Sequence, residues 1–99
     1  MENKKVDEIL EGLGGDIQVG KRYYIFAVPF HYIGTVAKIT AETIILDEND
    51  NYIVMNAGGE EDAVSQIVAG KKKPQIWEKC PGRILIFKGS ISTIISMKK

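Results

Sequence analysis

Cysteine and histidine are almost absent from the 99 residues, and their scarcity excludes several kinds of site. A single cysteine, Cys80, cannot form a disulfide within the chain, and Cys80 with His31 cannot supply the four ligands of a structural zinc site. No glycine-rich phosphate loop follows a predicted strand, and the ligand pattern of a calcium loop is missing. We therefore expect no metal, no cofactor and no enzymatic activity.

Long apolar runs and a surplus of charge of either sign are also missing. No apolar run approaches the ~20 residues of a membrane span, and the N-terminus is too polar for a signal peptide. We expect a cytoplasmic protein that contacts no membrane. The 13 basic and 13 acidic residues cancel, which argues against a generic cationic nucleic-acid binder. The charges are nevertheless segregated, because residues 42–62 sum to −7 and residues 63–99 sum to +7.

The length predicts a single domain spanning residues 1–99, and a domain this short is often stabilised by association. Residues 1–15 predict an amphipathic helix, since Val6, Ile9, Leu10 and Leu13 recur at helical spacing. A frayed tail is the alternative for this segment.

The remainder of the sequence is typical of β structure. Strands are expected at residues 22–28, 33–39 and 43–47, then at 52–56, 83–88 and 90–96. The polar stretch 48–51 predicts a turn, so that residues 43–56 would form a hairpin. Residues 30–32 are expected in a turn after Pro29. Residues 57–82 are interpreted as an insertion with a short helix and surface loops. Several short strands in this length indicate a small barrel.

Two stretches resemble the motifs of one protein family. Residues 86–96 read Ile-Phe-Lys-Gly-Ser-Ile-Ser-Thr-Ile-Ile-Ser. They resemble the second motif of Sm-like (LSm) proteins, most closely the version in the bacterial RNA chaperone Hfq, where Tyr-Lys-His precedes Ala-Ile-Ser-Thr-Val-Val. Residues 34–36 and 44–47 resemble the start and end of the first Sm motif. The loop between them, residues 40–43, is one residue shorter than usual and lacks the acid and the Asn of the family.

The resemblance implies a fold and an assembly. The fold would be a small five-stranded Sm-like (SH3-like) barrel with an N-terminal α-helix and an insertion before the penultimate strand. The first motif would occupy residues 19–56, the insertion 57–82, and the second motif 83–96. Five to seven copies would form a ring, closed where strand 90–96 of one copy pairs with strand 83–88 of the next. The expected interface residues are Ile84, Ile86, Ile91, Ile94 and Ile95. A monomeric barrel of SH3 type is the alternative.

The resemblance also implies a ligand, U-rich single-stranded RNA. Carried over by position, the RNA-binding residues would be Lys88, Gly89, Glu42 and Thr43. Glu42 is a poor stacking partner and repels phosphate, while Lys88 repeated around a ring would concentrate positive charge. We expect an RNA-binding ring of bacterial or phage origin, of the RNA-chaperone kind. A ring used for protein–protein assembly without RNA is the alternative, in which Lys88 serves only solubility.

Overall fold

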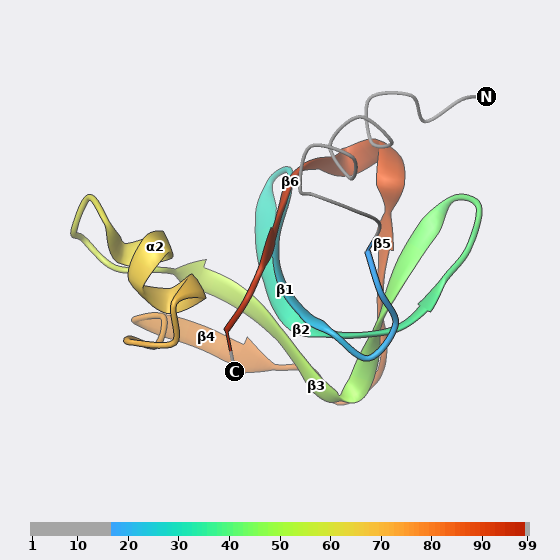
Figure 1. Cartoon of the computed structure of the whole chain (residues 1–99), viewed down its shortest axis with the longest axis horizontal. Coiled ribbons are helices and arrows are strands. Elements are labelled where there is room, and N and C mark those ends of the chain that lie inside the picture. Colours follow the sequence, from blue (N-terminus) through green and yellow to red (C-terminus); the bar gives the residue numbers. More distant parts are fainter. Residues whose placement is uncertain (1–16, 99) are drawn as a thin grey trace.

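The computed structural model describes residues 17–98, which form six strands, one α-helix and one 3-10 helix (Figure 1). The strands are β1 (Arg22–Ala27), β2 (Phe30–Ile39), β3 (Thr43–Asn56), β4 (Ile76–Lys79), β5 (Ile84–Phe87) and β6 (Ile91–Ser96). The helix α2 (Ala63–Val68) follows β3, and the 3-10 helix η1 (Lys88–Ser90) joins β5 to β6.

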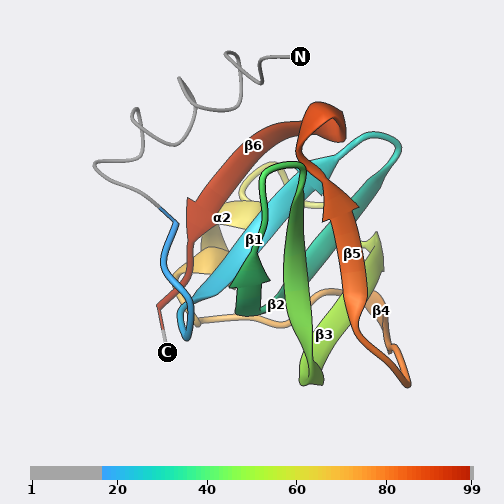
Figure 2. The same cartoon turned by 90° about the vertical axis from the view of Figure 1, so that its right-hand side faces the viewer.

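All strands pair antiparallel in one strongly curved sheet of order β4-β3-β2-β1-β6, in which β5 also pairs with β3. The long strand β3 bends along its length (Figures 1 and 2). Its first half pairs with β5, where Thr43 lies opposite Phe87, and its second half pairs with β4, where Val54 lies opposite Trp77. The strands β4 and β5 therefore occupy one edge of β3 in succession.

The bend in β3 lies opposite Gly34 in β2. Gly34 pairs with Asn51, yet Val36 pairs with Leu46, so residues 47–50 of β3 have no partner on β2. A Cβ atom on Gly34 would lie 2.6 Å from the backbone oxygen of Asp50 and 3.0 Å from Leu46 Cδ1. Only a residue without a Cβ allows the two backbones to approach this closely.

The predicted five-stranded barrel with an N-terminal helix is wrong. The sheet of residues 17–98 has six strands and stays open, because β5 pairs only with β3 and β6 only with β1. The short η1 carries the chain from the β3 edge to the β1 edge, so two consecutive strands end up at opposite edges. In this part of the chain the one α-helix is α2, only six residues long and inside the predicted insertion. The helix predicted for residues 1–15 lies outside the described residues.

Three local predictions also differ from the structure. Residues 43–56 form one strand rather than a hairpin, and the polar stretch makes the unpaired residues 47–50 instead of reversing the chain. Residues 30–32 begin β2 rather than forming a turn. No strand was expected within the insertion, yet residues 76–79 form β4, because they pair with β3 in a way that sequence patterning does not reveal.

Apolar side chains gather in two clusters on opposite faces of the curved sheet. The first lies inside the curve and comprises Ile17, Tyr23, Ile25, Ala27, Val36, Ile44, Leu46, Ile86, Ile91 and Ile94. The second lies beneath α2 and comprises Tyr24, Ile33, Val54 and Ile67, with half-buried Trp77, Tyr52 and Met97 packed against it. Alternation along β1 explains the division, since Tyr23 and Ile25 face one cluster and Tyr24 the other.

Polar contacts hold the bend in place. Asp50 accepts two hydrogen bonds from the Arg22 guanidinium, at 2.9 and 3.1 Å, and one from Thr35 Oγ1 at 2.6 Å. Burial raises the pKa of the Asp50 carboxyl, but these hydrogen bonds and the positive charges of Arg22 and Lys79 together hold the pKa below its ordinary value. The fully buried Asn51 donates to the Gly82 carbonyl and accepts from the Cys80 N–H, which fixes the break between β4 and β5.

Replacing Gly34 with alanine should destabilise the fold by about 2–3 kcal/mol, because backbone rather than a flexible side chain opposes the new methyl group. Urea unfolding followed by circular dichroism measures this change. Gly59→Ala is the matched control, since a Cβ there meets no atom within 4 Å. Equal stability of the two variants would contradict the close approach at Gly34.

Candidate nucleic-acid interface

Two loops predicted to form an RNA site lie side by side at one end of the sheet. Residues 40–43 connect β2 to β3, and η1 connects β5 to β6 (Figure 2). The Lys88 N–H donates to the Glu42 carbonyl at 2.8 Å, and Thr43 pairs with Phe87 in the β3–β5 ladder. The sheet thus brings Glu42, Thr43, Lys88 and Gly89 together.

These four residues differ in the groups that they offer to a ligand. Glu42 and Gly89 are exposed, and Lys88 is half-buried with no ion pair to any carboxylate of residues 17–98. The space around Gly89 is open, since an added Cβ would meet nothing within 4 Å. Thr43 is 8% exposed, and its Oγ1 lies 2.5 Å from Thr40 Oγ1, so its hydroxyl is already engaged within the loop. Of these four residues, one cation and one carboxylate remain available to a ligand.

The turn between β1 and β2 adds an apolar surface beside η1. The Val28 N–H donates to the Ser90 carbonyl at 3.1 Å. Val28 and Phe30 are 73% and 51% exposed, although both are large apolar residues. A groove of about 210 Å³ lies here, lined by Phe26, Ala27, Val28, Pro29, Phe30, His31 and Ser92. Three loops therefore meet at this end of the molecule, two of them polar and one apolar.

The single histidine, His31, lines this groove and belongs to an aromatic cluster. The His31 ring lies 4.1 Å from the Phe26 ring, centroid to centroid, and its Nδ1 is 2.9 Å from the Tyr24 hydroxyl. Burial lowers the pKa of His31 and raises the pKa of Tyr24. Both shifts favour neutral side chains, which share a hydrogen bond whose donor is set by the tautomer of His31.

The structure places the five predicted interface isoleucines mainly inside the chain's own core. Ile86, Ile91 and Ile94 are buried in the first cluster, while half-buried Ile84 and Ile95 pack against the first and second clusters.

Sequence reasoning missed the two apolar side chains that β5 directs outward. Leu85 and Phe87 are 56% and 61% exposed, whereas Ile84 and Ile86 on the alternate positions face inward. The signal for them was present, because four consecutive apolar residues make both faces of a strand apolar. An edge strand that is apolar on both faces is unusual unless a partner covers it.

Residues 17–98 contain no group of three or more His, Cys, Asp or Glu side chains that could hold a metal ion. In the same residues, no helix is long and apolar enough to cross a membrane. Comparisons with family models, with characterised protein sequences and with solved structures give no significant match. Functional inference for this chain therefore depends on its own residues and geometry.

His31 should titrate with a midpoint below 6.5 in the folded protein. As the pH falls, His31 takes up a proton in the unfolded chain before it does so in the folded protein. The contribution of neutral His31 to the stability of the fold is therefore complete above about pH 6.5. That contribution is lost as the pH falls from there through the folded pKa. Proton NMR of the imidazole resonances gives the midpoint directly, with His31→Gln as the control for assignment and for the pH dependence of unfolding. A midpoint above 6.5 would contradict a half-buried, neutral ring.

Proposed function

We propose that this chain is an Sm-like subunit that assembles into a homo-oligomeric ring of five to seven copies and binds single-stranded RNA. The main observation behind this proposal is that loop 40–43 contacts η1, where the Lys88 N–H donates a hydrogen bond to the Glu42 carbonyl. Lys88 is the cation of this junction. Repeated around a ring, it would give a circle of positive charge even though the chain has a net charge of zero.

The open sheet supports the ring part of the proposal. Within residues 17–98, β5 and β6 each pair on one side only, so each has a row of backbone groups free to join another strand. Pairing β6 of one copy with β5 of the next makes a head-to-tail contact, which closes into a ring when the rotation allows. The exposed Leu85 and Phe87 side chains on β5 would be covered near such a contact.

The apolar turn beside η1 supports the RNA part. Exposed Phe30 begins β2 directly after the turn whose Val28 N–H donates to the Ser90 carbonyl, and Ser90 follows Lys88 in η1. An exposed aromatic ring near a cation suits single-stranded RNA, because bases stack for about 1–3 kcal/mol each while lysines meet phosphates. Repetition of a weak site around a ring raises the overall affinity.

A ring used for protein–protein assembly is the second candidate. Two observations favour it: the acidic, exposed Glu42 is the residue whose carbonyl accepts from the Lys88 N–H, and the Thr43 hydroxyl is already engaged by Thr40. Both features weaken the pocket in which Sm-like proteins hold a uridine. RNA binding and its dependence on Lys88 separate the two candidates.

Light scattering should give a mass five to seven times the 11.0 kDa of the chain. Replacing Leu85 and Phe87 together with serine should shift the protein toward monomers, since it removes apolar surface that the neighbour would cover. Met55→Ser is the matched control, because Met55 is 56% exposed but lies in the second half of β3. A wild-type monomer at micromolar concentration would exclude the ring.

Lys88→Ala should weaken oligo-U binding while leaving the mass of the assembly unchanged. Removing each lysine–phosphate interaction should also lower the slope of log affinity against log salt by about 0.7. Fluorescence anisotropy with oligo-U, oligo-A and a duplex, at several salt concentrations, measures both effects. Glu42→Gln is the companion variant, and it should strengthen binding by removing a charge that repels phosphate. Unchanged binding in Lys88→Ala, or no salt-dependent binding by the wild type, would favour the assembly candidate.

A further inference from the structure

A second groove lies between the loop that follows α2 and the end of the chain beyond β6. Its volume is about 360 Å³, within the ~300–1,000 Å³ range of small-molecule sites. The side chains that give it its chemistry are Arg22, Tyr52, Lys72, Lys73, Trp77 and Lys98. The groove belongs to the α2–β4 end of the sheet, whereas η1 lies at the other end (Figure 1).

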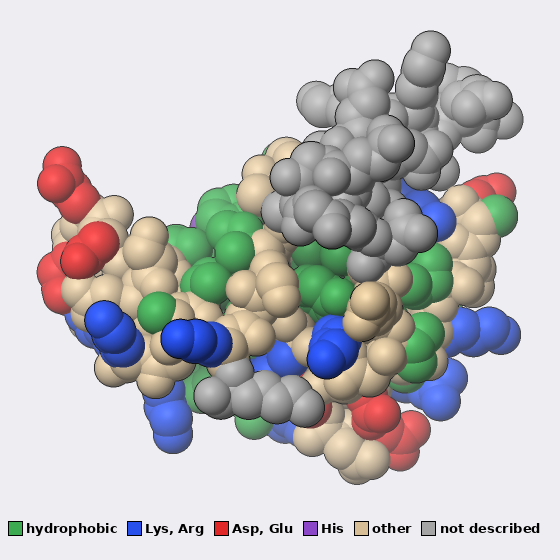
Figure 3. Space-filling view, in the orientation of Figure 1, with side chains coloured by type: hydrophobic (Ala, Val, Ile, Leu, Met, Phe, Trp, Pro, Cys, Tyr) green, Lys and Arg blue, Asp and Glu red, His purple; other side chains and the backbone are tan. Residues whose placement is uncertain are grey.

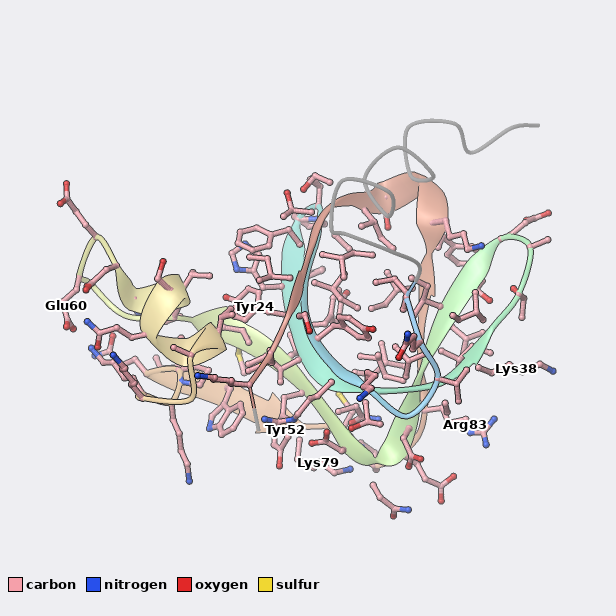
Figure 4. All side chains as sticks on the ribbon, viewed as in Figure 1. Tyr24, Lys38, Tyr52, Glu60, Lys79 and Arg83 are labelled. Atoms are coloured by element: carbon pink, nitrogen blue, oxygen red, sulfur yellow. The ribbon has the colours of Figure 1, made fainter. Side chains whose placement is uncertain are left out.

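Two stacked aromatic rings form part of the groove wall. The Tyr52 and Trp77 rings lie 4.1 Å apart, centroid to centroid, at an angle of 22°. They come from the paired strands β3 and β4, and both remain half-buried rather than enclosed. Figure 4 shows Tyr52 beside β4, far from Lys38 on the other side of the molecule. This wall offers a fixed aromatic surface to a planar ligand.

The charged side chains of the groove are all basic. Arg22 is paired with Asp50, and Lys72 is paired with Glu60. Lys73 and Lys98 are exposed and form no ion pair with any carboxylate of residues 17–98. No carboxylate of residues 17–98 lines the groove, and basic side chains gather on the surface below α2 (Figure 3). An anionic group here would meet two cations that pair with no carboxylate of those residues.

We propose that this groove binds one nucleotide unit, with its base against the Tyr52–Trp77 wall and its phosphate between Lys73 and Lys98. The pairing of an aromatic wall with basic side chains selects this ligand class. Inorganic phosphate would use the lysines without the rings, and an acidic peptide would leave the aromatic surface uncovered. The unit is either a free mononucleotide or one residue of single-stranded RNA. This site does not depend on Lys88 or on ring assembly.

Trp77 is the only tryptophan of the chain, so its fluorescence reports directly on the groove. Titration of the whole protein with UMP, AMP, oligo-U and inorganic phosphate tests the site. We expect saturable quenching by a nucleotide and none by phosphate alone. In the double variant Lys73→Ala/Lys98→Ala the Kd should rise about tenfold or more, because two charge-assisted hydrogen bonds to the phosphate are removed. Lys21→Ala/Lys38→Ala, which removes two exposed lysines outside the groove, should leave the Kd unchanged.

The pattern of quenching identifies the source of the ligand and also tests the proposal itself. Quenching by UMP or AMP identifies a mononucleotide site, and quenching by oligo-U alone identifies a residue of single-stranded RNA; both support the groove. Absent quenching, equal quenching by phosphate, or an unchanged Kd in Lys73→Ala/Lys98→Ala would overturn it. Lys88→Ala should leave the Trp77 response intact. If Lys88→Ala lost the Trp77 response while Lys73→Ala/Lys98→Ala kept it, the result would assign binding to the loops and refute the groove.

Discussion

Gly34 lies against the backbone of Asp50, and this contact determines how the rest of the sheet is arranged. It lets β2 and β3 cross closely while residues 47–50 leave the ladder, so β3 changes direction part-way along its length. The Asp50 carboxylate is held at that point by Arg22 and Thr35, which join β1 and β2 to the bend. Alternation along the strands makes both faces of the sheet apolar. The bent sheet encloses one cluster inside the curve and leaves its outer face to be covered by α2.

The bend also determines which strand edges remain unpaired. Because β3 turns away from its first direction, its outer edge holds two short strands, and the Asn51 side chain fixes the chain between them. The strand β5 is consequently short and lies at an edge, with Leu85 and Phe87 exposed. The three-residue η1 then leads to β6 at the opposite edge. The same bend that forms the core therefore leaves two free edges and places η1 beside loop 40–43.

The sequence predicted features that depend on neighbouring residues and missed those that depend on distant ones. The strands near β1, β5 and β6 were expected from their β-branched and aromatic residues. The polar stretch around Asn49 was expected to reverse the chain, because Asn and Asp favour turns in isolation. Arg22, 28 residues before Asp50, binds this stretch in the folded sheet, and no local pattern records that contact. Similarly, the stacking of Trp77 on Tyr52 in a basic groove depends on a strand pairing that patterning does not reveal.

The effect of the charged residues also depends on which of them the fold brings together. The acidic block of residues 42–62 and the basic block of residues 63–99 cancel in sum, but the fold uses them unequally. Asp50 and Glu60 are paired with Arg22 and Lys72, so part of the negative charge holds the bend and the insertion. Lys88 at one end of the sheet and Lys73 with Lys98 at the other have no carboxylate partner among residues 17–98. Local fields above such side chains depend on the nearest charges, because exposed charges more than about 10 Å apart are screened at ordinary salt. A chain of zero net charge can therefore present two basic surfaces, each beside exposed or half-buried aromatic rings.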